Sequence, residues 1–405
     1  MKFIYIDDEP DPAVAQALGT ESVSVYRFPD DLDHKMDKLA EEIRDCSVVI
    51  VDLKLADREP EEGAFSNPLY PQDGLALKEI LASILTKRAS QLESGVDAST
   101  IDVEPKTTAF VLYTGELDLL GDGAPARGRE HVIAKKIRGE WAMSKNPQMR
   151  PTSQVDLQIL QELADGVDVV AQKPWGDALE REDILKVIAE LLHLDRATSW
   201  ATTAERQIFE NRPPLQSLAK QDGVSLLRWM LHVILPYPSF LLDSVEVSLL
   251  CRLEPEWGVK ALGNSSNAFS ELFHDSLYRG LLSDFLGVRW WRAGVVAKLR
   301  QVTNGAPHNA ASLKNYFDQM HGSKTPMIDV ATPVRIVDEE FRLTNEIVDV
   351  EEAVRLEPEE WPLELAPPWI SLSKVADSSR LRRYVLERDI DRVESFLAAR
   401  RDDKK

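Results

Sequence analysis

The stretch "CSVVIVDL", residues 46–53, decides the fold. Its four β-branched residues, 48–51, run directly into Asp52. A continuous apolar run of this kind is typical of a parallel strand that helices cover on both faces. An acidic residue that follows such a strand lies at the carboxyl edge of the sheet, where reactive groups collect in open α/β folds.

Strand-like and helix-like stretches alternate on both sides of this run, through about residue 195. This alternation predicts a doubly wound, parallel, five-stranded sheet with right-handed crossovers. Three stretches exceed what such a fold needs, and we interpret 56–72, 93–106 and 117–155 as insertions. The expected strands are 2–6, 22–28, 46–53, 107–115 and 167–174, and the expected helices are 12–19, 31–45, 74–92, 156–166 and 181–194.

The charge of the chain is unevenly distributed. Residues 1–195 hold 21 Lys and Arg against 38 Asp and Glu, whereas residues 196–405 hold 27 against 30. This difference places a domain boundary near residue 195. The net charge of −20 argues against nucleic acid as a partner, because phosphate contacts need a basic surface.

The second half of the chain has a different character from the first. We expect a linker at 196–214, a mainly α-helical output or interaction domain at 215–330, and a segment of mixed extended and helical structure at 331–405. Cys46 and Cys251 lack metal-ligand spacing and are expected to be buried thiols. Without a signal peptide or a long apolar run, the sequence predicts a cytoplasmic protein with no membrane segment.

Polar side chains follow four of the expected strands. Asp7 and Asp8 end the first strand, Asp52 the third, Thr114 the fourth and Lys173 the fifth. Carboxylates brought so close would repel one another, and a divalent cation would relieve that repulsion. A set of oxygen ligands favours Mg²⁺. A carboxylate beside Mg²⁺ and a lysine can act as a nucleophile toward a phosphoryl group.

These stretches resemble the receiver domain of two-component response regulators. The resemblance rests on "IDDEP" (6–10), "VVIVDL" (48–53), "VLYTG" (111–115) and "DVVAQKPW" (168–175), in the family's order, and it covers residues 1–195. It implies a flavodoxin-like fold with strand order 2-1-3-4-5 and Mg²⁺ as the cofactor.

The resemblance also implies roles for individual residues. Asp52 would be the phosphoacceptor, Thr114 the switch hydroxyl and Lys173 the cation that binds the acyl phosphate. Asp7 and Asp8 would bind Mg²⁺ together with Asp52 and the backbone carbonyl of Lys54.

The sequence departs from the family pattern at three positions. Ala56 stands where a proline commonly follows the acceptor by four residues. Val170 replaces the aromatic residue usual three places before the lysine. Lys54 puts a basic side chain at a position that tunes dephosphorylation.

We therefore expect a response regulator that a histidine kinase or phosphotransfer protein phosphorylates, and that signals to another protein through its helical domain. Beyond catalysing its own modification, such a chain would not be an enzyme. One alternative is an interaction or scaffold subunit with a silent receiver. Another is an enzyme in residues 200–405 under receiver control. A haloacid-dehalogenase-type phosphatase would need an Asp-x-Asp loop that "DDEP" lacks. The sequence leaves a homodimer open.

Overall fold

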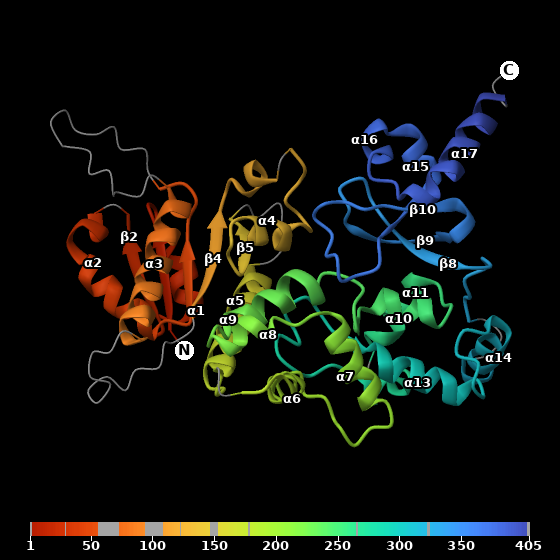
Figure 1. Ribbon diagram of the computed structural model, residues 1–405, viewed down its shortest axis with the longest axis horizontal. Helices are drawn as coiled ribbons and strands as arrows, with labels where there is room; N and C mark the ends of the chain where they lie inside the picture. The colour runs from red at the N-terminus through yellow and green to blue at the C-terminus, as the bar shows by residue number, and fades with distance from the viewer. Residues whose placement is uncertain are drawn as a thin grey trace. The chain divides into compact units, whose positions relative to one another are not determined.

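The computed structural model of the chain comprises two compact units (Figure 1). The first comprises Met1–Val187 and Pro214–His232, and the second comprises Ile188–Pro213 and Val233–Lys405. The segment expected as a linker, 196–214, holds helix α7 (Ala201–Glu210) and falls mostly in the second unit. The structure describes residues 2–28, 30–55, 73–93, 108–121, 123–145, 153–176, 179–264, 266–321 and 325–402.

A five-stranded, all-parallel sheet forms the centre of the first unit, with strand order β2-β1-β3-β4-β5. The predicted α/β architecture and its strand order are thus confirmed, and the run 48–51 lies in the middle of the sheet with every side chain buried. The strands are β1 (Phe3–Asp7), β2 (Val23–Arg27), β3 (Val48–Val51), β4 (Ala109–Thr114) and β5 (Trp141–Ser144).

Helices cover both faces of the sheet. One face packs against α2 (Asp30–Glu42) and α3 (Gly74–Glu93) through side chains such as Leu39, Leu77 and Leu81. The other face contacts α5 (Ser153–Ala171), which also packs against α1 (Pro12–Leu18).

The fifth strand is not where the sequence predicted it. Residues 167–174 were expected as a strand, but 153–171 form one helix, α5. Its buried residues Leu160, Leu163, Ala164, Val167 and Val170 follow helical spacing, so the run "VDVV" continues a helix face and Gly166 does not end the helix.

The true fifth strand, β5, lies within the stretch 117–155 that was interpreted as an insertion. This stretch also holds α4 (Glu130–Lys136), which packs beside β5. It therefore supplies the fourth helix and fifth strand of the fold, and the insertion prediction was wrong here. The other two predicted insertions, 56–72 and 93–106, lie outside the described residues except for Glu93, the last residue of α3.

Three further helices belong to this unit wholly or in part. Helices α8 (Leu215–Ala219) and α9 (Val224–Trp229) lie within it, and α9 contacts α5. Helix α6 (Arg181–Leu191) carries the chain from the first unit to the second. A π-helical turn, Met230–Ile234, directly follows α9 and also crosses the boundary between the units.

The second unit begins with a helical part, as the sequence predicted for this region. Its core gathers side chains such as Phe269, Phe273 and Phe317 around a short ribbon of β6 (Leu241–Leu242) and β7 (Trp290–Trp291). Its helices are α7, α10 (Ser244–Leu250), α11 (Pro255–Leu262), α12 (Ala268–Leu272), α13 (Arg292–Val302) and α14 (Ala310–His321).

A separate four-stranded sheet with order β10-β11-β8-β9 follows, and three helices accompany it. Its core includes Val354, Ile370 and Val375, so the extended and helical segment predicted at 331–405 is a packed structure. The elements are β8 (Pro333–Val337), β9 (Leu343–Asp349), β10 (Ala353–Arg355), β11 (Trp369–Ser371), α15 (Leu372–Asp377), α16 (Ser379–Arg382) and α17 (Ile390–Asp402).

Candidate functional site

Three carboxylates meet at the carboxyl edge of the parallel sheet. Asp7 is the last residue of β1, Asp8 follows it, and Asp52 follows β3, which is hydrogen-bonded to β1. One carboxylate oxygen from each residue lies within 4.8 Å of the others. Asp7 and Asp52 are buried and Asp8 is half-buried, so this cluster has the ligand type and spacing for a metal ion.

A lysine that the sequence analysis did not select balances these charges. Nζ of Lys145, the residue after β5, lies 2.5 Å from Oδ2 of Asp7 and 2.8 Å from Oδ2 of Asp52. Burial lowers the pKa of Lys145, but hydrogen bonds and charges from Asp52 and Asp7 outweigh burial and raise it above its ordinary value. Lys145 is therefore held as a cation between the two carboxylates.

Lys173, which the sequence analysis placed in this site, follows the end of α5 instead of a strand. Its backbone N–H donates to the carbonyl of Val170 in the last turn of the helix. Asp168, five residues earlier, accepts a hydrogen bond from Ser47, which precedes β3. This end of α5 therefore lies at the amino edge of β3, opposite to Asp52, and the structure does not bring Lys173 to the carboxylates.

Asp7 is held firmly by its surroundings. Its Oδ2 accepts a hydrogen bond from the Tyr5 hydroxyl at 2.6 Å, and its Oδ1 accepts one from the backbone N–H of Glu9 at 3.0 Å. Burial and the neighbouring Asp7 raise the pKa of Tyr5, so its phenol remains a donor. With Lys145 as a third donor, the Asp7 carboxylate has little freedom to rotate.

The repulsion within the cluster acts on the ionised form of Asp8. Burial raises its pKa, and the hydrogen bond with Asp7 and the negative charges of Asp7 and Asp52 raise it further. Lys145 alone does not relieve this repulsion. A bound divalent cation would favour the ionised form of Asp8 and remove the repulsion.

One oxygen of Asp52 has no partner within the described residues. Oδ2 accepts from Lys145, but Oδ1 is buried without a hydrogen bond. A buried acceptor of this kind costs free energy unless a ligand satisfies it. The three carboxylates therefore fit a hard cation as ligands. They also leave one carboxylate oxygen of Asp52 available for reaction.

The backbone around Asp52 is fixed by a close approach from α3. A Cβ on Gly74, the first residue of α3, would lie 1.7 Å from the carbonyl oxygen of Asp52. The Gly74 N–H also donates to the carbonyl of Leu53 at 3.0 Å. Only glycine permits this packing, so Gly74 fixes the backbone beside Asp52, a constraint that the sequence pattern did not reveal.

Thr114 and Lys54 lie at the same edge of the sheet. Thr114, the last residue of β4, is buried and pairs in register with Ser144, next to Lys145. Its hydroxyl oxygen accepts a hydrogen bond from the N–H of Glu116, which leaves the hydroxyl proton to donate. The Lys54 side chain is exposed, and its Nζ lies 3.7 Å from Glu116. Ala56 lies outside the described residues.

A second buried ionic group lies at the other end of β5. Glu140, the residue before this strand, is fully buried. It accepts hydrogen bonds from the N–H of Phe110 and, at 2.6 Å, from Nε of Arg228 on α9. Nε2 of His232 lies 3.1 Å from the Glu140 carbonyl oxygen. One short strand therefore connects the carboxylate cluster with α9.

Burial dominates the titration of this second group. It raises the pKa of Glu140, and the charge of Arg228 opposes that shift. It lowers the pKa of His232 to about 4, although the hydrogen bond with Glu140 opposes this shift. The charge of Arg228 therefore offsets part of the cost of burying the Glu140 carboxylate.

Comparison with known proteins gives no relative from which to transfer a function. No family model, curated protein or solved structure matches the chain. Among the described residues, no helix is both long enough and apolar enough to cross a membrane.

Proposed function

We propose that the chain is a response regulator whose first unit is a flavodoxin-like receiver domain phosphorylated on Asp52. The observation that carries this proposal is the position of Lys145 between Asp7 and Asp52, beside an unpaired Asp52 oxygen. A buried nucleophile, two further acidic ligands and a fixed cation are the groups that phosphoryl transfer to a carboxylate requires.

The reaction follows from these positions. A carboxylate oxygen of Asp52 attacks the phosphorus of an acyl phosphate or phosphohistidine donor. The new O–P bond forms as the donor's P–O or P–N bond breaks, and the leaving carboxylate or imidazole takes the electron pair. Lys145 neutralises a phosphoryl oxygen as charge develops there, and the Thr114 hydroxyl donates to another.

Mg²⁺ is the cofactor we propose for Asp7, Asp8 and Asp52, because all three are hard oxygen ligands. When bound, Mg²⁺ would neutralise phosphoryl oxygens during transfer. The backbone carbonyl of Lys54 is the further ligand we assign to it. A histidine kinase or phosphotransfer protein is the donor that this chemistry implies.

Strand β5 offers a route by which phosphorylation reaches α9, the helix of the first unit after which the chain crosses into the second. Lys145 at its end contacts the phosphorylation site, and Glu140 at its start holds Arg228 of α9. When Lys145 moves from Asp7 to a phosphoryl group, β5 shifts. This shift changes the ion pair between Glu140 and Arg228 of α9. Ala142 lies three residues before Lys145, at the position where receiver domains usually have an aromatic residue. No aromatic side chain at this position can therefore change conformation on phosphorylation.

Beryllofluoride, a stable mimic of the phosphoryl group, tests the proposal on the full chain. With Mg²⁺ it should bind once per chain and alter hydrogen exchange in peptides containing Asp52, in β5 and in α9. An Asp52→Asn variant should show none of these changes. Equal binding by both proteins would contradict the proposal.

A further inference from the structure

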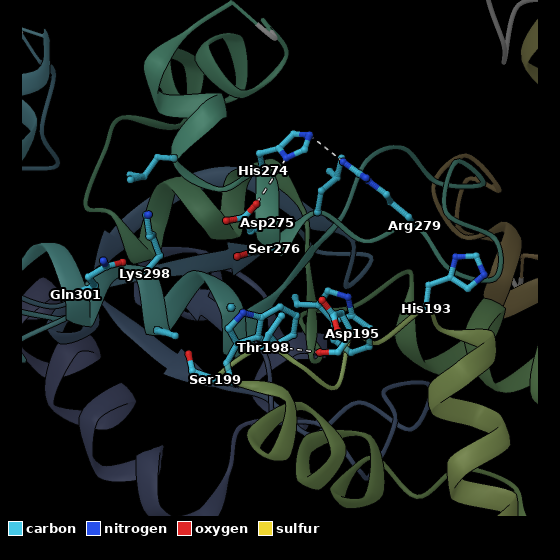
Figure 2. Close-up of a pocket in the computed structure, with 16 residues that line it drawn as sticks. His193, Asp195, Thr198, Ser199, His274, Asp275, Ser276, Arg279, Lys298 and Gln301 are labelled. Atoms are coloured by element: carbon cyan, nitrogen blue, oxygen red, sulfur yellow. Dashed lines mark hydrogen bonds and ion pairs between the residues drawn. The ribbon is translucent and has the colours of Figure 1, made fainter.

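A cavity of about 840 Å³ lies wholly within the second unit and shares no residue with the carboxylate cluster. Figure 2 shows the residues that line it. Its lining comes from the residues before α7, from the segment 272–279 and from α13. A volume of this size accommodates a small organic ligand.

One wall of the cavity is aromatic. Trp200 is half-buried and packs against the buried Trp291, with ring centroids 6.1 Å apart. A Cβ on Gly294 of α13 would lie 3.0 Å from the Trp200 ring and 2.5 Å from the Ser276 hydroxyl. The glycine therefore allows α13 to support Trp200 closely, and the indole presents a fixed flat surface for stacking.

Two cations lie at the cavity and come from opposite sides of it (Figure 2). Among the described residues, neither Lys298 nor Arg279 has a carboxylate within ion-pair distance. Nη2 of Arg279 instead lies 2.8 Å from Nε2 of His274, which must accept because guanidinium only donates. Two cations that form no ion pair within the described part of the chain are suited to anionic groups on a ligand.

The cavity lining also includes acidic and hydroxyl side chains. The carboxylates of Asp195 and Asp275 also line the cavity, with Asp195 accepting the N–H of Ala197 in a turn. The hydroxyl of the buried Ser276 lies between the two sides of the cavity (Figure 2). Carboxylates accept hydrogen bonds from sugar hydroxyls, as acidic residues do for ribose in dinucleotide sites.

We propose that this cavity binds a nucleotide. Its base stacks on Trp200, its phosphate groups contact Lys298 and Arg279, and its ribose hydroxyls donate to a carboxylate of the rim. Simple inorganic anions lack the ring and the hydroxyl groups and bind more weakly. The proposal is independent of Asp52 and of phosphorylation.

Calorimetric titration of the full chain tests this site. The probes are ATP, NAD and a cyclic dinucleotide, with pyrophosphate as the anion without a base. EDTA in the buffer keeps divalent metal away from the carboxylate cluster. We expect at least one nucleotide to bind, and to bind more tightly than pyrophosphate.

Variants localise the binding. Lys298→Gln and Arg279→Gln should each weaken it about tenfold or more, because each removes a charge-assisted hydrogen bond. Arg300→Gln, on the same helix but outside the cavity lining, should leave it unchanged. Trp200→Leu should weaken nucleotide binding more than pyrophosphate binding, provided that circular dichroism shows a folded protein.

Three results would overturn the proposal. The first is the absence of binding by every nucleotide at millimolar concentration. The second is pyrophosphate binding as tightly as the nucleotides. The third is nucleotide affinity that Lys298→Gln and Arg279→Gln leave unchanged. Because Lys298 is half-buried and Arg279 is exposed, these two variants test the proposal even if Trp200→Leu does not fold.

Discussion

Replacement of Arg228 by glutamine isolates the contact between Glu140, the residue before β5, and α9 within the first unit. The change leaves the fully buried Glu140 carboxylate with only the N–H of Phe110 as a partner. Removing one member of a buried ion pair typically costs about 3–5 kcal/mol. Because the Arg228 side chain is 41 % exposed, water already weakens the pair, and we expect about 2 kcal/mol.

The pH dependence of this loss distinguishes an ion pair from simple packing. Burial raises the pKa of Glu140 and Arg228 opposes that rise, so the variant's Glu140 should protonate at a higher pH than the wild type's. A protonated Glu140 needs no cation, and the destabilisation should therefore shrink as the pH falls.

Scanning calorimetry of the full chain measures the effect. A loss of about 2 kcal/mol corresponds to a decrease of roughly 4–8 °C in the melting temperature of a unit of about 200 residues. Lys35→Gln, which breaks the exposed ion pair with Asp31 at 2.6 Å, should lower the melting temperature far less. A loss in Arg228→Gln that equals this control, or that grows in acid, would refute the reasoning.

Three further predictions follow from the site and its surroundings. Lys145→Gln should slow labelling by acetyl phosphate about tenfold or more, whereas Lys173→Gln should label at the wild-type rate; the opposite result would restore the assignment of Lys173. Gly74→Val should abolish beryllofluoride binding measured by calorimetry, because the new side chain collides with the Asp52 backbone, and unchanged binding would contradict that collision. His232 has a pKa of about 4 when folded and about 6.5 when unfolded, so the unfolded chain binds more protons between these values. Stability from urea unfolding should therefore fall by up to about 3 kcal/mol as the pH falls from about 6.5 to about 4, and His232→Gln should flatten this slope; a variant with the wild-type slope would exclude His232.

The first four strands of the parallel sheet could be predicted because their signal is local. Residues 48–51 form an apolar run that ends in Asp52, and the same pattern places Asp7 and Thr114 at strand ends. The carboxylate cluster follows from strand adjacency, since β1 and β3 are neighbours in the sheet.

The fifth strand could not be predicted from the same signal. The valines of 167–170 are compatible both with a buried strand and with a helix that buries one face, and only the packing of this segment against the sheet decides between the two. The four residues of β5 are too short to show a period, and the Lys145 that follows them is one of several basic residues in the region. Gly74 carried no sequence signal either, because its importance arises from packing against Asp52.

Phosphorylation of Asp52 itself tests the central claim most directly. Intact-protein mass spectrometry after incubation with acetyl phosphate and Mg²⁺ should show one added phosphoryl group on the wild-type chain. The Asp52→Asn chain should remain unmodified under the same conditions. Addition of a phosphoryl group to Asp52→Asn, or its absence from the folded wild-type chain, would contradict the account.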